Sequence, residues 1–378
     1  MQFSRNGLFR TSGISACLGL MVCLVFVAGC PWCWPFAGTT PTDVLSATDT
    51  FPTSLHATRP GKDFWYKTAN GGFESLTGVP MSTLPCEGCH NSTARPDGSV
   101  IEASTYVPSC ADCHILPGAD TVAQETCIGC HSRQGNAHQF EDFHRDTLGF
   151  TCMSCHSLRE MHGDGNSYDA MWSEGAIDTK CENCHTTLAS NTYHDTHAET
   201  VDCSGCHTLT VVTCNNCHLE SMVEGKVKRF YSPPATGFQY LVRKKSTGKV
   251  TTGSMQSLTY EGNSFYAIGP FQGHTIVKNA KVCGDCHGNA AVTQYFNDGE
   301  ITVTEWDDVA GTLNGPTGVI PVPPDWATAF QLDFVDYLGD PTSGVTDPDA
   351  WVFLKHGADG TQMMFADPLT AEQMNKLR

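Results

Sequence analysis

Eight copies of one five-residue motif, Cys-x-x-Cys-His, constrain this chain more than any other feature. They use 16 of the 20 cysteines. In chain order the copies are Cys86, Cys89 and His90; Cys110, Cys113 and His114; Cys127, Cys130 and His131; Cys152, Cys155 and His156; Cys181, Cys184 and His185; Cys203, Cys206 and His207; Cys214, Cys217 and His218; and Cys283, Cys286 and His287. Seven of the eight lie within residues 86–218, so the motifs are closely spaced in that stretch.

Three kinds of chemistry use paired cysteines. Zinc sites do so, but a zinc ligand set has no reason to place a histidine directly after each pair. Disulfides would leave the eight adjacent histidines unexplained. Covalent haem explains both, because thiols at i and i+3 form thioethers with two porphyrin vinyl groups and the next imidazole binds the iron. We therefore expect eight c-type haems, with the eight motif histidines as proximal iron ligands.

The remaining histidines equal the motifs in number. Of 16 histidines, eight lie outside the motifs: His56, His138, His144, His162, His194, His197, His274 and His356. We expect them to be the distal ligands, and two imidazoles leave no site for a substrate at iron and favour a low reduction potential. His194 and His197 share one face if they lie on a helix, so they can reach two different haems. If His56 or His356 is not a ligand, one haem is open or bound by methionine.

The first 29 residues read as an export signal. Arg5 and Arg10 precede an apolar run over residues 14–28 that is short for a membrane-spanning helix. The run ends Val-Ala-Gly-Cys, which resembles a bacterial lipobox with Cys30 as the acylated residue; the alternative is ordinary cleavage that leaves Cys30 and Cys33 as a pair. We expect an exported lipoprotein of the outer membrane, facing the periplasm or the cell surface.

The spacing of the motifs predicts the organisation of the chain. Residues 1–29 form the lipoprotein signal peptide and residues 30–80 a tether or N-terminal arm. Residues 81–218 form a seven-haem block, which has too few residues per haem for a conventional core. Residues 219–300 form a β-containing segment with the eighth haem, where runs such as 238–242 and 264–268 predict strands. Residues 301–378 form a C-terminal wrapping segment that includes short extended segments.

The predicted fold class is accordingly a multihaem cytochrome c. We expect mostly loops and short helices wrapped around stacked haems. A small antiparallel β segment lies between the seventh and eighth motifs.

Charge limits the possible partners. The chain has 22 Lys and Arg against 40 Asp and Glu, a formal charge of −18, which argues against a nucleic-acid partner. Residues 219–282 are locally basic, with nine Lys or Arg and three acids. We expect either a docking patch for an acidic redox protein or basic side chains that pair with haem propionates or remain solvated.

Residues 152–156, 160–165 and 181–185 resemble the multihaem cytochromes c of bacteria that respire metals or sulfur compounds, a group loosely allied with cytochrome c3. The resemblance covers residues 86–340. It implies a periplasmic or outer-surface electron carrier with closely packed haems, active in anaerobic respiration or extracellular electron transfer. The chain lacks the Cys-x-x-Cys-Lys motif that some multihaem reductases use at the active haem.

Three functions follow, and the first is favoured. The first is electron transfer through haems anchored to the membrane by lipid, with no catalytic residues. The second is an oxidoreductase acting on a small nitrogen or sulfur oxyanion at one open haem, as in hydroxylamine-oxidising octahaem enzymes, with Tyr193 or Asp195 available as acid or base. The third is a homo-oligomeric subunit of an extracellular cytochrome filament, in which His56 or His356 binds a neighbour's haem.

Overall fold

The computed structural model describes residues 46–378 except 82–83, 85–94, 100–106 and 118–120. Residues 45–378 cluster into one compact unit. The predicted signal peptide and the acylation site Cys30 lie outside the described residues. So do Cys86, Cys89 and His90, the three predicted haem-binding residues of the first motif. No helix among the described residues is long and apolar enough to cross a membrane.

The helices are short. Those before the first strand are α1 (Ala47–Thr50), α2 (Leu55–Thr58), α3 (Gly61–Tyr66), α4 (Glu74–Thr77), α5 (Gln124–Cys130), α6 (Ser132–Ala137), α7 (Leu158–His162), α8 (Thr192–His197) and α9 (Cys203–His207). Later helices are α10 (Leu219–Glu224), α11 (Cys283–Cys286), α12 (Ala290–Asp298), α13 (Trp326–Ala329) and α14 (Ala371–Leu377). Single helical turns are η1 (Phe51–Thr53), η2 (Thr68–Asn70), η5 (Cys110–Asp112), η6 (Phe143–Thr147), η7 (Cys152–Ser154), η8 (Cys181–Asn183) and η9 (Pro348–Ala350).

Side-chain caps fix where several of these helices begin. The Asn191 side chain accepts hydrogen bonds from the backbone N–H groups of Tyr193 and His194, and the Asn289 side chain caps the start of α12 in the same way. Such caps satisfy N–H groups that the helix itself leaves free. Short segments can therefore hold a helical turn beside a motif without a long helix.

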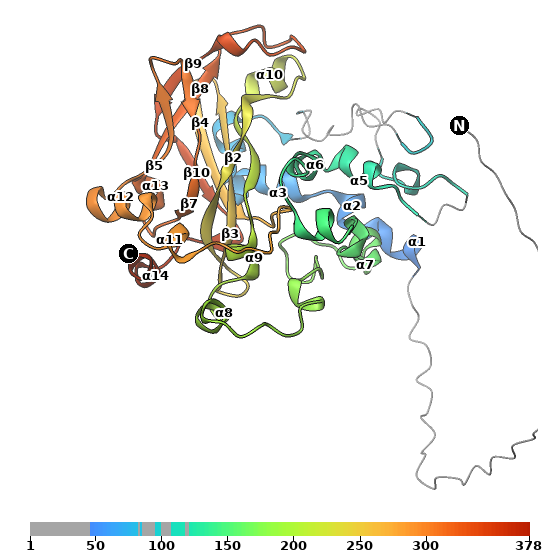
Figure 1. Ribbon diagram of the computed structural model, residues 1–378. Helices are drawn as coiled ribbons and strands as arrows, with labels where there is room; N and C mark the ends of the chain where they lie inside the picture. Colours follow the sequence, from blue (N-terminus) through green and yellow to red (C-terminus); the bar gives the residue numbers. More distant parts are fainter. Residues whose placement is uncertain (1–45, 82–83, 85–94, 100–106, 118–120) are drawn as a thin grey trace, which may run out of the picture. The chain divides into compact units, whose positions relative to one another are not determined.

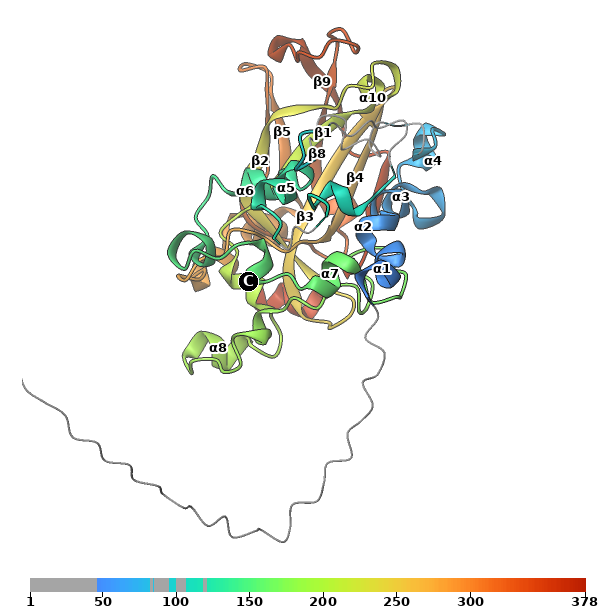
Figure 2. The same ribbon diagram turned by 90° about the vertical axis from the view of Figure 1, so that its right-hand side faces the viewer.

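A seven-stranded sheet forms the centre of the second half of the chain. Its strands run in the order β10-β4-β3-β1-β2-β11, and β7 pairs with β2 outside that order. The bounds are β1 (Val211–His218), β2 (Arg229–Lys244), β3 (Val250–Tyr260), β4 (Asn263–Pro270), β7 (Gly318–Pro321), β10 (Gly360–Met363) and β11 (Ala366–Asp367). Figures 1 and 2 show helices α1–α7 gathered on one side of this sheet.

Two hairpins build the larger sheet. Tyr240 to Arg243 of β2 pair directly with β3. At the other end of this pairing β1 lies between the two strands, antiparallel to β2 and parallel to β3. β3 and β4 are joined by Glu261 and Gly262, which both have positive φ, 46° and 76°. A two-residue hairpin with both φ angles positive matches the right-handed twist of the strands.

Strand β2 is buried on both faces. Phe238, Tyr240 and Val242 pack in the largest apolar cluster, whereas Leu241 packs with Leu369 on the opposite side. A sheet covered on both faces has continuous apolar runs rather than alternation.

A second sheet has four strands in the order β6-β5-β8-β9. Its bounds are β5 (Ile301–Asp307), β6 (Thr312–Asn314), β8 (Phe330–Tyr337) and β9 (Trp351–His356). Ile301, Val303 and Phe334 from this sheet join the same apolar cluster as the larger sheet. The two sheets therefore share one core.

The predicted fold class is wrong. The strands expected at 238–242 and 264–268 lie in β2 and β4, but they belong to a seven-stranded sheet and not to a small β segment. The segment 301–378 contributes strands β5 to β11 rather than merely wrapping a haem core. Motifs are closely spaced only up to β1, and a single motif follows it. The chain beyond β1 is therefore long enough to bury a conventional core.

The shared core gives a direct test. Phe334 is 1% exposed, so Phe334→Ala removes a buried ring and should lower the free energy of unfolding by about 3–5 kcal/mol. Val309→Ala is the matched control, because Val309 is 98% exposed and should cost under about 0.5 kcal/mol. Chemical denaturation measures both, and equal small effects would contradict a core at Phe334.

Candidate functional site

Six of the described motifs form a helical turn. They lie in η5, at the end of α5, and in η7, η8, α9 and α11. In five of them the backbone N–H of the histidine donates to the carbonyl of the first cysteine at 2.8–3.0 Å. This bond closes one turn and places residues i and i+3 on the same side. Both thiols of each motif are therefore held on one side of the backbone.

The histidine of each of these six motifs lies opposite a second histidine from outside the motifs. The ring centroids are 6.1–6.3 Å apart in every case. The pairs, here called the six paired sites, are His114–His162, His131–His56, His156–His274, His185–His144, His207–His194 and His287–His197. Two imidazoles that bind one metal ion between them, with metal–nitrogen bonds of about 2 Å, have centroids about 6 Å apart.

One short helix supplies two of the partners. His194 and His197 lie on α8 and face His207 and His287, which belong to the sixth and eighth motifs. This arrangement agrees with the expectation that the two side chains reach different sites.

Backbone carbonyls orient several of these rings through Nδ1. Nδ1 lies 2.9 Å from the Val277 carbonyl in His207 and 2.8 Å from the Lys376 carbonyl in His287. In His194 and His197 the carbonyls are those of Ala189 and Tyr193, at 2.8 and 3.0 Å. A carbonyl only accepts, so Nδ1 carries the proton and Nε2 keeps its lone pair for a metal.

His156 has a carboxylate in place of a carbonyl. Its Nδ1 lies 2.6 Å from Oε2 of Glu160, whose side chain is 1% exposed. Burial opposes ionisation of Glu160, but hydrogen bonds from Asp178 and Thr179 and the contact with His156 lower its pKa to about 2. An ionised carboxylate on Nδ1 makes the imidazole a stronger ligand.

Burial favours the neutral form of the motif histidine at a second paired site. Burial, and then the neighbouring His56 and His156, lower the pKa of His131 to about 4. The ring is therefore neutral at pH 7, as a metal ligand must be.

The thiols of different motifs lie close enough to affect one another's pKa. The interacting thiols are Cys113 with Cys130, Cys127 with Cys152, Cys155 with Cys184, Cys181 with Cys203, and Cys206 with Cys286. For example, burial and then Cys152 raise the pKa of Cys127 to about 11. The order is second, third, fourth, fifth, sixth and eighth motif, here called the array, and no cysteine described in these motifs forms a disulfide.

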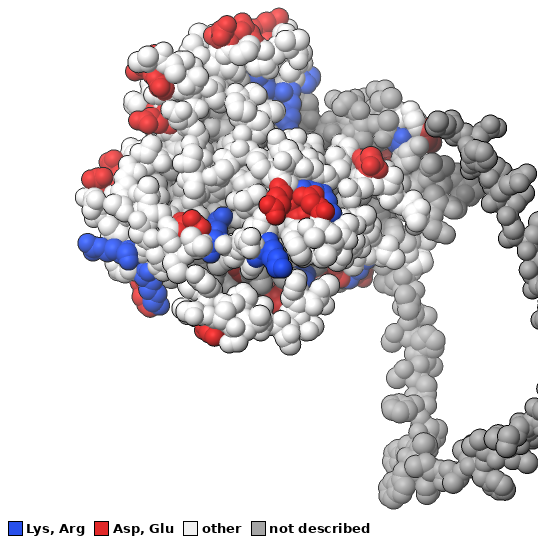
Figure 3. Space-filling view, viewed as in Figure 1, with Lys and Arg blue, Asp and Glu red and all other residues white. Residues whose placement is uncertain are grey.

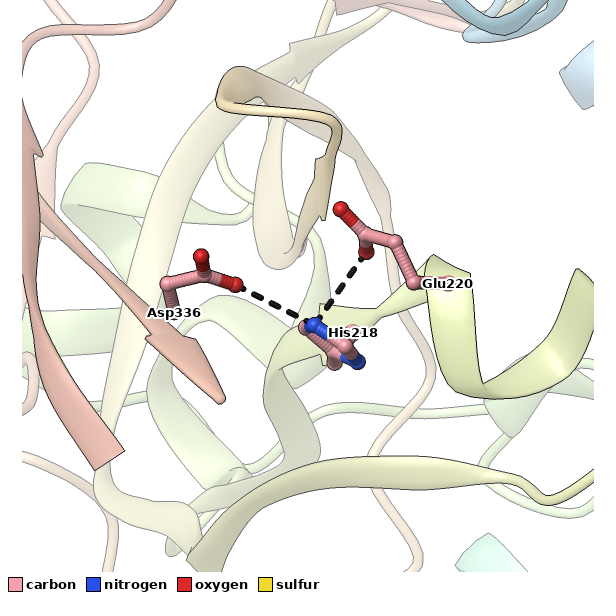
Figure 4. Close-up of side chains that lie close together, drawn as sticks. All are labelled: His218, Glu220 and Asp336. Atoms are coloured by element: carbon pink, nitrogen blue, oxygen red, sulfur yellow. Dashed lines mark ion pairs between the residues drawn. The ribbon is translucent and has the colours of Figure 1, made fainter. Parts of the chain in front are cut away.

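The seventh motif differs. Cys214, Cys217 and His218 lie in strand β1, and the side chain of His218 is 5% exposed. Its Nε2 lies 3.1 Å from Oδ1 of Asp336 and 3.3 Å from Oε2 of Glu220 (Figure 4). Among the described residues no second histidine ring faces it.

Sequence reasoning did not find Glu220 and Asp336. Glu220 follows His218 by two residues, which is a weak signal. Asp336 comes from the distant strand β8, and no motif marks it.

The first motif is known from the sequence alone. Cys86 and Cys89, the predicted thioether residues, and His90, the predicted proximal ligand, lie outside the described residues. Their assignment to a haem therefore stays a prediction from the sequence.

Two predicted distal ligands lie outside the paired sites. His356 is 81% exposed on β9, and its Nδ1 lies 2.5 Å from Oδ1 of Asp333. His138 follows α6, and the described residues supply no histidine ring opposite it. Both remain predictions as ligands, since His90 of the first motif is not among the residues that the structure describes.

The residues considered for an open haem are surface residues of α8. Tyr193 is 53% exposed, and Asp195 accepts a hydrogen bond from Ser190. Among the described residues, neither has a contact with a second acid or base that would mark it as catalytic.

Several basic residues of 219–282 have partners within the chain. Arg229 is buried, Arg243 pairs with Asp367 at 3.0 Å, and Lys281 donates to the Thr208 carbonyl at 2.8 Å. Figure 3 shows basic and acidic side chains interspersed on the face drawn. These contacts engage three of the nine basic residues of the segment, and the docking patch stays a prediction.

Comparison with models of known families, with curated proteins and with solved structures finds no match for this chain. The function is therefore argued from the chain's own residues.

Glu160 predicts a pH dependence. Its pKa is about 2 in the folded protein and near the ordinary 4.5 when unfolded, so the unfolded state binds more protons between these values. The stability from Glu160 is complete above pH 4.5 and is lost as the pH falls towards 2. Glu160→Gln should cost about 1.5–3 kcal/mol at neutral pH and progressively less in acid.

Denaturation at several pH values measures this difference. The exposed Glu174→Gln is the control and should match the wild type throughout. A cost for Glu160→Gln that does not shrink in acid would contradict the assignment.

Proposed function

We propose that this chain is a c-type cytochrome that binds several haems and transfers electrons between redox partners. The observation that supports this most is the set of six paired sites. Each combines a cysteine pair on one helical turn, the adjacent histidine, and a second histidine about 6 Å away. This donor set is what a covalently attached haem with two axial imidazoles requires.

The residues present fit the group. The two motif cysteines of each site would form the thioethers, and the Nε2 atoms of each histidine pair would be the axial ligands. Bound haem would supply a one-electron Fe(III)/Fe(II) couple at each site. The carbonyls at Nδ1 hold the imidazoles of the sixth and eighth motifs in a fixed orientation.

Two imidazoles at one iron leave no position for a substrate, and this favours a carrier over an enzyme. The described residues show six such pairs. The thiols of the array lie close enough that each of its motifs influences the pKa of a thiol in another motif or is influenced by one. A carrier of single electrons needs sites arranged in this way.

The cellular setting belongs to the same proposal and rests on sequence. The signal over residues 1–29 and the lipobox at Cys30 would place the protein on the outer membrane, exposed to the periplasm or the cell surface. Its partners would be other redox proteins.

The first test uses intact mass and low-temperature EPR on the oxidised holoprotein. Mass gives the number of attached haems, and we expect every haem of the six paired sites to be low-spin with two imidazoles. A chain without covalent haem would overturn the proposal. A stoichiometric high-spin signal assigned to a paired site would overturn the carrier function.

A single variant should open one site. His194→Ala removes the partner of His207, so one haem should change from low-spin to high-spin while the others keep their signals. Thr196→Ala, an exposed change on the same helix, is the control and should leave the spectrum unchanged. An unchanged spectrum for His194→Ala would show that His194 is not the ligand.

A further inference from the structure

The seventh motif has the same five-letter pattern as the others but a different conformation. In the six paired sites the motif forms a helical turn, whereas Cys214 to His218 belong to strand β1 and pair with β2 and β3. Cys217 is 2% exposed. The array also passes from the sixth to the eighth motif through Cys206 and Cys286, without the seventh.

The space at His218 Nε2 is already taken. Asp336 and Glu220 lie within 3.3 Å of this atom, on the side where an iron would bind. The rings of Tyr337 and Trp351 lie 5.8 and 6.4 Å from the imidazole, both edge-on. A porphyrin is far larger than a carboxylate, and the residues at this motif do not fit it.

The same atoms fit a small cation. Ligand atoms about 2 Å from a tetrahedral metal ion lie about 3.3 Å from each other. The distances from Nε2 to the two carboxylate oxygens are 3.1 and 3.3 Å, and the three ligand atoms all lie within 4.8 Å of one another. Figure 4 shows both carboxylates directed at the same ring nitrogen.

A second observation points to a ligand. Oε2 of Glu220 is buried and, apart from its 3.3 Å approach to His218 Nε2, makes no hydrogen bond, although the other oxygen accepts the N–H of Glu261. A buried carboxylate oxygen without a donor is costly. A cation bound between Glu220 and Asp336 would satisfy it and balance two negative charges.

Neighbouring groups orient the ligands. His218 Nδ1 lies 2.9 Å from Oγ of Ser221, which is hydrogen-bonded by the guanidinium of the buried Arg229. Oδ1 of Asp336 accepts the N–H of Tyr337 at 2.9 Å. Such contacts around metal ligands hold their orientation.

We propose that His218, Glu220 and Asp336 bind one divalent transition-metal ion of the zinc type, and that the seventh motif carries no haem. The mixed nitrogen and oxygen set suits such an ion. The zinc site does not depend on the proposed function, whereas the claim that the seventh motif carries no haem rests on it.

The test uses the holoprotein with Zn²⁺ as the probe. After treatment with a chelator, Zn²⁺ is titrated by calorimetry into wild type, Asp336→Asn, Glu220→Gln and the control Asp349→Asn, an exposed residue. We expect one site per chain in wild type and control, and at least about tenfold weaker binding in both ligand variants. Circular dichroism identifies a variant that does not fold, in which case the other ligand variant decides.

Peptide mapping of the same holoprotein decides the haem part. We expect the peptide with residues 214–218 to be unmodified and the peptides of the six paired sites to carry haem. Haem on 214–218, or Zn²⁺ binding that neither variant weakens, would overturn this inference while leaving the proposed function intact. Haem on no peptide would overturn the proposed function instead.

Discussion

The approach of two imidazoles to about 6 Å is the interaction on which the first half of the structure depends. In the described part of residues 46–210, buried apolar side chains gather mainly at Tyr66, Phe73, Met81 and Leu84, near α3 and α4. The motif-bearing turns are joined mainly by polar contacts and by these pairs. Each pair links segments that are distant in sequence, such as His56 with His131 and His156 with His274. Metal ligation at these points would connect the chain much as disulfides do in small secreted domains.

The site was more predictable than the fold. The Cys-x-x-Cys-His motifs are local, so their cysteines and histidines could be read directly, and the spacing of His194 and His197 indicated two separate targets. Which histidine faces which motif depends on tertiary packing and could not be read. The two sheets were underestimated because β2 is buried on both faces and shows no alternation, and because β5 and β8 pair in parallel across a long connection.

The seventh motif shows the limit of a sequence pattern. Val211 and Val212 favour an extended chain just before Cys214, and the pairing of β1 with β2 and β3 fixes it in the sheet. The same five letters then present a buried imidazole to two carboxylates. The sequence motif identifies the donor atoms, but the backbone conformation determines what they can bind.

Helix α8 carries the partner histidines of two neighbouring sites, those of the sixth and eighth motifs. It has six residues, none of them buried, and it is held by short-range hydrogen bonds such as the Asn191 cap and by the bond from Lys249 to the Ala198 carbonyl. A helix of this length is not stable alone in water. Its order would therefore come from the metal bonds of His194 and His197, so ligation at one site would prearrange the other. The sixth and eighth motifs would mature cooperatively, as one unit, and release their distal ligands together.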